Sequence, residues 1–394
     1  MNNKKRYAVL LSGFFINMSL GVLYSWSVFS LNLTEELHWT KTSAALPYTV
    51  AIIMFAVMMI PAGKLQDKFG GRKVASFGGI LTGAGLVLSS FFPTVMGVCF
   101  SFGLLSGSGI GMAYAAVTPS VVKWFPDNKK GLVTGVVVAG FGLSPVYMAP
   151  LTNWMINSFG IYTSFRTLGV AILILVVLLS QLLFKPEMMD LGKMEVKTEN
   201  ECWKKMAKSK EFIMLWVMFL SGSLGGLMII GHLSKITAMQ LGTNVGFVLV
   251  ALAAISNASG RPTFGVISDK IGRARTMILL SVIQGSAFLV FPHLNTFALL
   301  MLGAAVVTFT YGGSFAVYPS AVSDYYGKEN FGRNYGILFS AWGLGGVLGP
   351  LSAGKIADVT GNYEMAYMIA AVLSLLAALI GLKFYMNEKK LAKK

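Results

Sequence analysis

The sequence predicts an all-α membrane protein with twelve transmembrane helices arranged in two six-helix bundles. Hydrophobic residues make up 55% of its 394 residues and charged residues only 12%, whereas soluble domains carry about 25% charged residues. Apolar runs recur along the whole chain at close to the roughly 20 residues that a helix needs to cross a bilayer. An internal duplication divides these runs into two equivalent sets.

Twelve apolar runs define the predicted helices. The first follows Lys4, Lys5 and Arg6, but it is longer than the apolar core of about 7–15 residues in a signal peptide and has no small-residue cleavage site. We therefore expect it to be retained as a helix. The predicted ranges are 7–31, 43–63, 74–92, 95–122, 131–152, 161–184, 211–236, 243–266, 275–293, 297–322, 333–356 and 362–386.

The formal net charge of +16 is distributed as the positive-inside rule describes. With both termini in the cytoplasm, most of the 32 Lys and Arg residues fall in cytoplasmic loops and tails. The predicted external side holds only Lys41, Arg166, Lys235 and Lys355. The charge therefore reports topology and excludes a nucleic-acid partner, and it predicts a multi-pass protein of the cell membrane, of the bacterial inner-membrane type.

Several functional classes are excluded by residue content. The two cysteines, Cys99 and Cys202, suggest no disulfide framework, and no Cys or His spacing indicates a metal site. No nucleophile–base constellation indicates an enzyme, and no cofactor is expected.

The duplication is clearest in a short loop that occurs twice in the sequence. Residues 63–73 recur as residues 265–275, and Pro119 and Pro150 recur as Pro319 and Pro350. Parallel repeats of this kind are typical of transporters that bind their substrate between two bundles.

The repeat predicts three regions along the chain. These are an N-terminal six-helix bundle over 1–185, a polar and charged cytoplasmic linker over 186–210, and a C-terminal six-helix bundle over 211–394.

The duplicated loop resembles the G-x-x-x-D-x-x-G-R-K signature of the major facilitator superfamily, and this resemblance covers essentially the whole chain. It implies that Asp67 and Asp269 pair with basic residues or a helix end on the cytoplasmic face and stabilise one conformation. The alternative is that both are solvated loop residues. The residues assigned to this gating motif are Gly63, Asp67, Arg72, Gly265, Asp269 and Arg273.

Arg261 is the anomaly of the chain, because it lies inside the predicted helix 243–266. Placing a guanidinium in the membrane costs from about 2.5 to above 10 kcal/mol, and arginine does not escape this cost by losing its proton. The carboxylates lie in loops or at helix ends, except for Glu364 at the start of the last helix. An anionic ligand is therefore the favoured partner, and snorkelling to the nearby cytoplasmic interface is the alternative.

The repeat shows that the architecture does not require this charge. At the spacing of the duplicated loop, Arg261 corresponds to Met59 and Asn257 to Phe55. Asn257 lies four residues before Arg261, so both share one face of the helix. This pair is the core of the predicted carboxylate site.

Further candidates come from helices expected to line a central cavity. Tyrosine hydroxyls can donate to a carboxylate, although interfacial or packing roles are equally open for each of them. His232 is the candidate for proton coupling because its side chain titrates near neutral pH, with an interfacial role as the alternative. The remaining substrate-site candidates are Tyr24, Tyr114, Tyr311, Tyr318 and, as a wall, Trp342.

A closer resemblance is carried by the Ser-Asn-x-x-Gly-Arg-Pro stretch over 256–262, which looks like the monocarboxylate transporters and the oxalate/formate antiporter family. Residues 21–27 and 335–343 are similar to the latter. The resemblance implies that Arg261 binds a substrate carboxylate. Oxalate exchangers carry a lysine where this chain has Trp342, so one fixed cation favours a monoanion.

The expected function is secondary active transport of small monocarboxylates such as lactate, pyruvate or formate, by alternating access and linked to protons. Carboxylate exchange of the oxalate/formate type is the first alternative. A drug exporter and a carboxylate-binding membrane sensor are the others. The expected partners are a small carboxylate anion, a proton or counter-anion, and membrane lipid, and the chain is expected to be a monomer.

Overall fold

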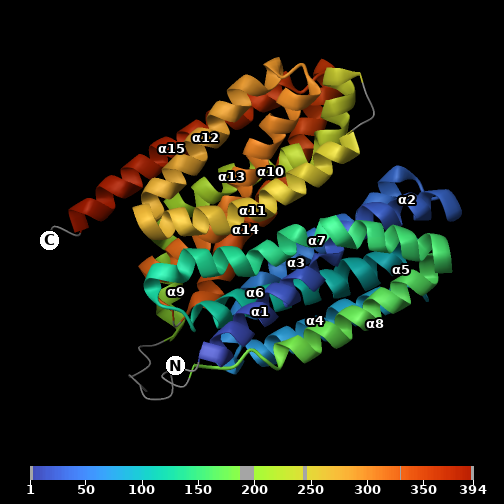
Figure 1. Ribbon diagram of the computed structural model, residues 1–394, viewed down its shortest axis with the longest axis horizontal. Coiled ribbons are helices and arrows are strands. Elements are labelled where there is room, and N and C mark those ends of the chain that lie inside the picture. Colours follow the sequence, from blue (N-terminus) through green and yellow to red (C-terminus); the bar gives the residue numbers. More distant parts are fainter. Residues whose placement is uncertain (1–2, 187–198, 243–245, 329, 392–394) are drawn as a thin grey trace. The chain divides into compact units, whose positions relative to one another are not determined.

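The computed structural model describes residues 3–186, 199–242, 246–328 and 330–391, and its regular elements are helices (Figure 1). Most of the predicted linker, residues 187–198, lies outside the described residues, as do residues 243–245 at the start of one predicted helix. The chain divides into two compact units. Unit 1 comprises Met1–Phe125, Val137–Lys197 and Tyr326–Ser340, and unit 2 comprises Pro126–Val136, Thr198–Tyr325 and Ala341–Lys394.

Unit 1 is built from the N-terminal helices, with α4 packed against both α6 and α8. Glycines allow these close approaches, because a Cβ on Gly83 would meet the backbone of Gly169 and a Cβ on Gly169 would meet that of Gly83. Its elements are α1 (Asn3–Leu20), η1 (Gly21–Ser25), α2 (Trp26–Glu36), α3 (Lys41–Phe69), α4 (Gly71–Ser89), α5 (Val95–Val98), η2 (Cys99–Ser106), α6 (Gly107–Val122), most of α7 (Lys130–Phe159) and α8 (Ile161–Ser180).

Unit 2 contains the C-terminal helices, with α15 packed against α10 and α12. The first residues of α7 belong to it, and in the same way the first residues of α14 belong to unit 1. Its elements are η3 (Asp127–Lys129), α9 (Glu199–Lys208), α10 (Lys210–Leu241), α11 (Gly246–Ile271), α12 (Arg273–Val290), η5 (Phe291–His293), α13 (Phe297–Tyr326), most of α14 (Phe331–Thr360) and α15 (Glu364–Leu391).

The duplicated loop ends two helices in the same way. Gly70 follows α3 with φ of 87°, and Gly272 follows α11 with φ of 92°. A positive φ is accessible to glycine without a steric penalty, so both helices stop at equivalent positions of the repeat and the chain turns into the next helix.

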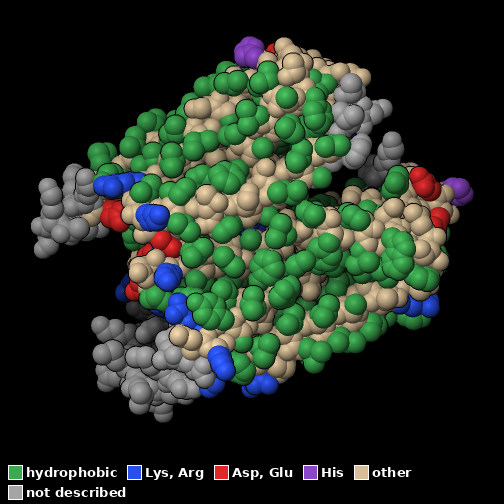
Figure 2. Space-filling model, viewed as in Figure 1, with side chains coloured by type: hydrophobic (Ala, Val, Ile, Leu, Met, Phe, Trp, Pro, Cys, Tyr) green, Lys and Arg blue, Asp and Glu red, His purple; other side chains and the backbone are tan. Residues whose placement is uncertain are grey.

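Within the described residues, ten helices are long and apolar enough to cross a membrane. Hydrophobic side chains cover their exposed faces in the view of Figure 2, as lipid contact requires. Two further predicted ranges, 74–92 and 243–266, correspond to α4 and α11, which are not among these ten. The count of twelve and the cytoplasmic position of the termini stay predictions.

Two predicted helices of unit 1 contain irregular turns. The range 7–31 is interrupted by the 3₁₀ segment η1, and the range 95–122 contains the π-helical segment η2. A Cβ on Gly21 would collide with Ser144 of α7, so the 3₁₀ segment begins where the chain lies directly against α7. Tyr24 lies in this segment.

Candidate functional site

Arg261 is fully buried, with 0% of its surface exposed. It lies ten residues before the last residue of α11, Ile271, which corresponds to about 15 Å along the helix axis. The helix therefore extends further beyond Arg261 than predicted. The snorkelling alternative is wrong, since a snorkelling side chain would expose its guanidinium at the end of the helix.

The guanidinium contacts two side chains of unit 2. Its Nε donates a hydrogen bond of 3.3 Å to Oδ1 of Asn257, one turn earlier on α11. Its Cζ lies 4.7 Å from the centre of the Phe315 ring on α13. A cation over an aromatic face is stabilised by about 2 kcal/mol when it is desolvated. The contact with Asn257 holds the Nε end of the guanidinium group toward the N-terminal part of α11, away from the loop at Gly272.

The helices α11 and α13 approach closely along this stretch because glycines face the opposite backbone. A Cβ on Gly260 would collide with the carbonyl of Phe309, and a Cβ on Gly312 with the carbonyl of Asn257. The close approach brings the ring of Phe315 to Arg261. Sequence reasoning missed Phe315, although its position four residues after Tyr311 places both on one helix face.

Tyr311 and Trp342 are brought together next to Phe315. The indole Nε1 of Trp342 donates a hydrogen bond of 2.8 Å to the hydroxyl oxygen of Tyr311. The Phe315 ring centre lies 5.1 Å from that of Tyr311 and 6.4 Å from that of Trp342, both edge to face. Four of the predicted substrate-site residues, Asn257, Arg261, Tyr311 and Trp342, thus gather around one phenylalanine.

Tyr318 lies two turns further along α13. Its ring packs on Phe219 of α10, at 5.1 Å between centres, and its side chain is 2% exposed. The contacts of Tyr318 are those of a core residue.

Tyr24 and Tyr114 belong to an aromatic cluster in unit 1. Both pack edge to face on Phe141, at 5.2 and 5.3 Å, and Tyr114 also packs on Phe55 at 5.4 Å. Phe55 and Met59, the repeat equivalents of Asn257 and Arg261, are 0% exposed. The position that carries a charge in unit 2 is therefore occupied by apolar packing in unit 1.

His232, the proton-coupling candidate, has both ring nitrogens in hydrogen bonds. Nε2 lies 2.8 Å from the carbonyl oxygen of Pro350, and Nδ1 lies 2.9 Å from the hydroxyl of Tyr363. A carbonyl only accepts, so Nε2 carries the proton and Nδ1 accepts from Tyr363. This arrangement fits a neutral imidazole that connects α10, α14 and the turn before α15.

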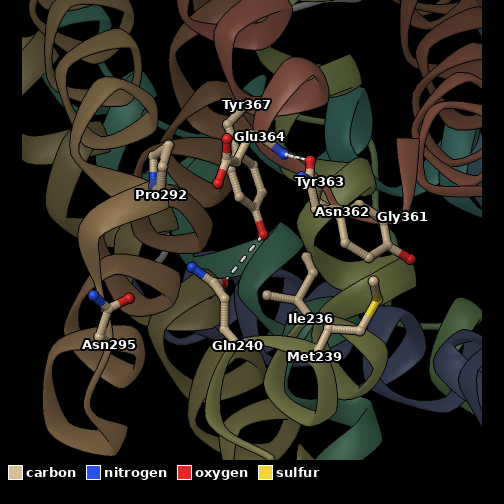
Figure 3. Close-up of a pocket in the computed structure, with 10 residues that line it drawn as sticks. All are labelled: Ile236, Met239, Gln240, Pro292, Asn295, Gly361, Asn362, Tyr363, Glu364 and Tyr367. Carbon is tan, nitrogen blue, oxygen red and sulfur yellow. Dashed lines mark hydrogen bonds between the residues drawn. The ribbon is translucent and has the colours of Figure 1, made fainter.

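A pocket of about 230 Å³ opens beside this turn (Figure 3). Within it, the Tyr367 hydroxyl donates to Oε1 of Gln240 at 3.3 Å, and the Gln240 amide donates to the Phe291 carbonyl. The described residues that line this pocket are Ile236, Met239, Gln240, Pro292, Asn295, Gly361, Asn362, Tyr363, Glu364 and Tyr367. The predicted substrate-site residues are not among them.

The two aspartates of the duplicated loop cap helix N-termini. In unit 1, Asp67 accepts hydrogen bonds from the backbone N–H groups of Gly332 (3.1 Å) and Arg333 (2.9 Å) at the start of α14. In unit 2, Asp269 accepts from those of Gly131 and Leu132, both at 2.8 Å, at the start of α7. Their side chains are only 11% and 7% exposed, so the solvated-loop alternative is wrong.

The basic partners of the two aspartates differ. Asp269 forms an ion pair of 2.8 Å with Arg273, which also contacts Asp324 at 2.8 Å. Asp67 has Lys123 at 3.9 Å. Arg72 instead donates to Gln181, directly after α8, at 2.7 Å. At the spacing of the repeat, Arg72 corresponds to Ala274, and Gly71 corresponds to Arg273.

The glycines of the motif sit where helices cross. A Cβ on Gly63 would collide with the carbonyl of Gly332, and a Cβ on Gly265 with the carbonyl of Gly131. Each aspartate lies four residues after its glycine, so the close crossing places the carboxylate next to the N-terminus of the other helix.

Substitution Gly265→Ala is expected to lower stability by about 1–3 kcal/mol, because the new methyl group would meet backbone atoms that cannot move independently. The measurement is thermal unfolding in detergent. The matched control is Gly222→Ala, where the nearest atoms lie 3.5 Å from the added Cβ and the better helix propensity of alanine is expected to raise stability slightly. Equal melting temperatures for the two variants would contradict this prediction.

Asp269→Asn is expected to destabilise the protein by more than Asp67→Asn. The amide keeps only one of the two acceptor oxygens, so in either case one hydrogen bond to the helix N-terminus is lost, at about 0.5–1.5 kcal/mol. The change at Asp269 also removes the ion pair with the buried Arg273. Thermal unfolding compares the two variants directly. Asp127→Asn is the control, since this side chain is 75% exposed, and a larger effect there than at Asp269 would refute the assignment.

Comparison with known proteins places these features in a family. The family model of the Major Facilitator Superfamily matches residues 9–259 and 238–394. The chain is 31% identical to the uncharacterised MFS-type transporter YhjX of Escherichia coli, over 87% of this chain and 86% of that protein. It is 29% identical to the oxalate:formate antiporter of Oxalobacter formigenes, over 91% and 86%. It is 26% identical to the human monocarboxylate transporter 2, over 89% and 80%.

Solved structures share the fold. The fucose:proton symporter FucP of Escherichia coli superposes with a TM-score of 0.77 at 14% identity, covering 96% of this chain and 98% of that one. The proton:xylose symporter XylE superposes with a TM-score of 0.76 at 14% identity, covering 98% and 96%. The predicted resemblance is thus confirmed, and the chain belongs to the major facilitator superfamily of membrane transporters.

Proposed function

We propose that the chain transports small monocarboxylates, such as lactate, pyruvate or formate, across the cell membrane by alternating access. The observation that carries this proposal is the fully buried guanidinium of Arg261, held by Asn257 and Phe315 in the interior of unit 2. Burying a cation within a membrane-spanning segment carries a large free-energy cost, so such charges usually have a function. A carboxylate matches its planar donor fork in charge and geometry.

The surroundings of Arg261 favour a substrate with one negative charge. Asn257 and Phe315 are neutral, and Trp342 contributes an indole rather than a second cation to the same cluster. The aromatic rings suit the short apolar part of a monocarboxylate. A dicarboxylate would leave its second charge in this apolar wall, which is costly. The named activities of two relatives, oxalate:formate exchange and monocarboxylate transport, support the substrate class.

Uptake of labelled lactate, pyruvate and formate into proteoliposomes tests the proposal. We expect saturable uptake of at least one of them, with competition by other monocarboxylates and little competition by oxalate or malonate. Equal competition by dicarboxylates would contradict the monoanion preference. Export of lipophilic cations without carboxylate flux would favour a drug exporter, and binding without flux would favour a sensor.

We propose that transport is coupled either to protons, as the sequence resemblance implies, or to exchange of one anion for another. Exchange is favoured by the two hydrogen bonds of His232, which fit a fixed neutral ring, and by the neutral amide that contacts Arg261. Exchange needs no titrating group, because a carboxylate on Arg261 compensates its charge during the conformational change. Uptake driven by a pH gradient into empty vesicles supports proton linkage, whereas uptake that requires a preloaded anion supports exchange.

A further inference from the structure

We propose that Trp342 is a positioning residue that directs the hydroxyl group of Tyr311 toward the carboxylate bound by Arg261. This inference rests on the proposed function and adds a second, neutral donor to the site. The carboxylate is thus bound by the guanidinium fork from one side and by an oriented phenol from another.

The direction of the hydrogen bond between the two residues is unambiguous. An indole N–H is only a donor, and a phenol oxygen both donates and accepts. Trp342 therefore donates to Tyr311 across the 2.8 Å contact. The Tyr311 hydroxyl proton must then point away from the indole, so Tyr311 acts as a donor on its other side.

The ring of Tyr311 is held in place by three helices. A Cβ on Gly226 of α10 would collide with this ring, so the glycine lets it lie directly against the α10 backbone. Phe315 packs edge to face on its second side, and Trp342 of α14 anchors the hydroxyl end. Tyr311 is 1% and Trp342 is 4% exposed. A donor fixed in this way loses little conformational entropy when it binds a ligand.

Phe315 connects this donor to the cation. Its ring contacts both the Arg261 guanidinium, at 4.7 Å, and the Tyr311 ring, at 5.1 Å. The residue after Tyr311, Gly312, packs on Asn257 one turn before Arg261, so Tyr311 and Arg261 lie on helix segments that contact each other. A carboxylate offers about four lone-pair sites, and the guanidinium fork takes two of them. A phenol donor fits one of the others.

A double-mutant cycle on the full-length protein tests the inference, with lactate affinity measured by calorimetry in detergent and KM by proteoliposome uptake. Tyr311→Phe is expected to weaken lactate binding about 10-fold, the loss of one hydrogen bond to a charged group. Trp342→Phe is expected to weaken it by a smaller factor, and Trp342→Phe in the Tyr311→Phe background is expected to have no further effect. Tyr367→Phe, which removes another buried hydroxyl in unit 2, is the matched control and should leave the affinity unchanged.

A packing role for Trp342 predicts a different result. Its substitution would then weaken binding equally in both backgrounds, and this additive outcome overturns the proposal. Unchanged affinity in Tyr311→Phe also overturns it, and because that variant lacks a single oxygen atom, it remains informative if Trp342→Phe unfolds. If the unsubstituted protein binds lactate, pyruvate and formate normally but the cycle is additive, only this inference fails. If the unsubstituted protein binds none of them, the proposed function fails as well.

Discussion

Arg261→Ala is expected to reduce lactate or pyruvate uptake by at least about 100-fold, because two hydrogen bonds to a charged group contribute about 1.5–3 kcal/mol each. The substitution removes the only side chain of the Arg261, Asn257, Phe315, Tyr311 and Trp342 cluster that bears a positive charge. The cost of burying a carboxylate there would then be uncompensated. Initial rates in proteoliposomes, normalised to the amount of reconstituted protein, measure the effect.

Two further variants separate the charge of Arg261 from its shape. Arg261→Lys keeps a cation but loses the planar fork, so we expect an intermediate loss, seen mainly as a raised KM. Ser259→Ala changes an exposed side chain of the same helix, whose hydroxyl bonds only locally to the Ser256 carbonyl, and should transport normally. Normal uptake by Arg261→Ala would refute the proposed site.

Asn257→Asp is expected to make lactate transport strongly pH-dependent. The introduced carboxylate would lie at the 3.3 Å contact with Arg261 and compete with the substrate, which should reduce uptake at neutral pH about 10-fold, equivalent to about 1.4 kcal/mol. Binding of lactate to Arg261 would remove the counter-charge of the new carboxylate and so favour its protonation. By reciprocity, proton binding would then favour lactate binding. Uptake should therefore rise as the pH falls.

The control for this prediction is Asn257→Ala, which removes the contact to Nε without adding a charge. We expect a loss of affinity that does not depend on pH, because the guanidinium loses its orientation and keeps its charge. Measurement of KM across a pH series distinguishes the two variants. A flat pH profile for Asn257→Asp would show that position 257 does not influence proton coupling.

Several features of the protein were predictable from local patterns. Apolar length and charge placement identified the membrane class, and the duplicated loop identified the family. Arg261 and Asn257 were predictable because a charge in an apolar run is rare and a spacing of four residues defines a helix face. Aspartates near helix ends suggested the capping role of Asp67 and Asp269.

Other features depend on which helix faces meet. The partner of Tyr311 is Trp342, 31 residues away on another helix, and no spacing within either helix indicates that contact. The sequence does not distinguish Phe315 from the other 26 of its 27 phenylalanines, whereas the structure places its ring over Arg261. Arg72 and Arg273 looked equivalent in the motif, yet one contacts Gln181 and the other contacts Asp269. A shift of one position in the repeat turns the two side chains toward different helices.

The amino-acid sequence alone establishes that this chain spans a membrane, that it is duplicated, and that it carries one arginine its architecture does not require. These conclusions follow from composition, periodicity and charge, which are properties of the chain before it folds. The tertiary structure adds that Arg261 is fully buried, that Asn257 and Phe315 hold it, and that Trp342 donates to Tyr311 beside it. Glycines at positions 226, 260 and 312 allow the helices to approach closely enough for these contacts. The contact energies depend on the distances between helices, and those distances cannot be read from the sequence.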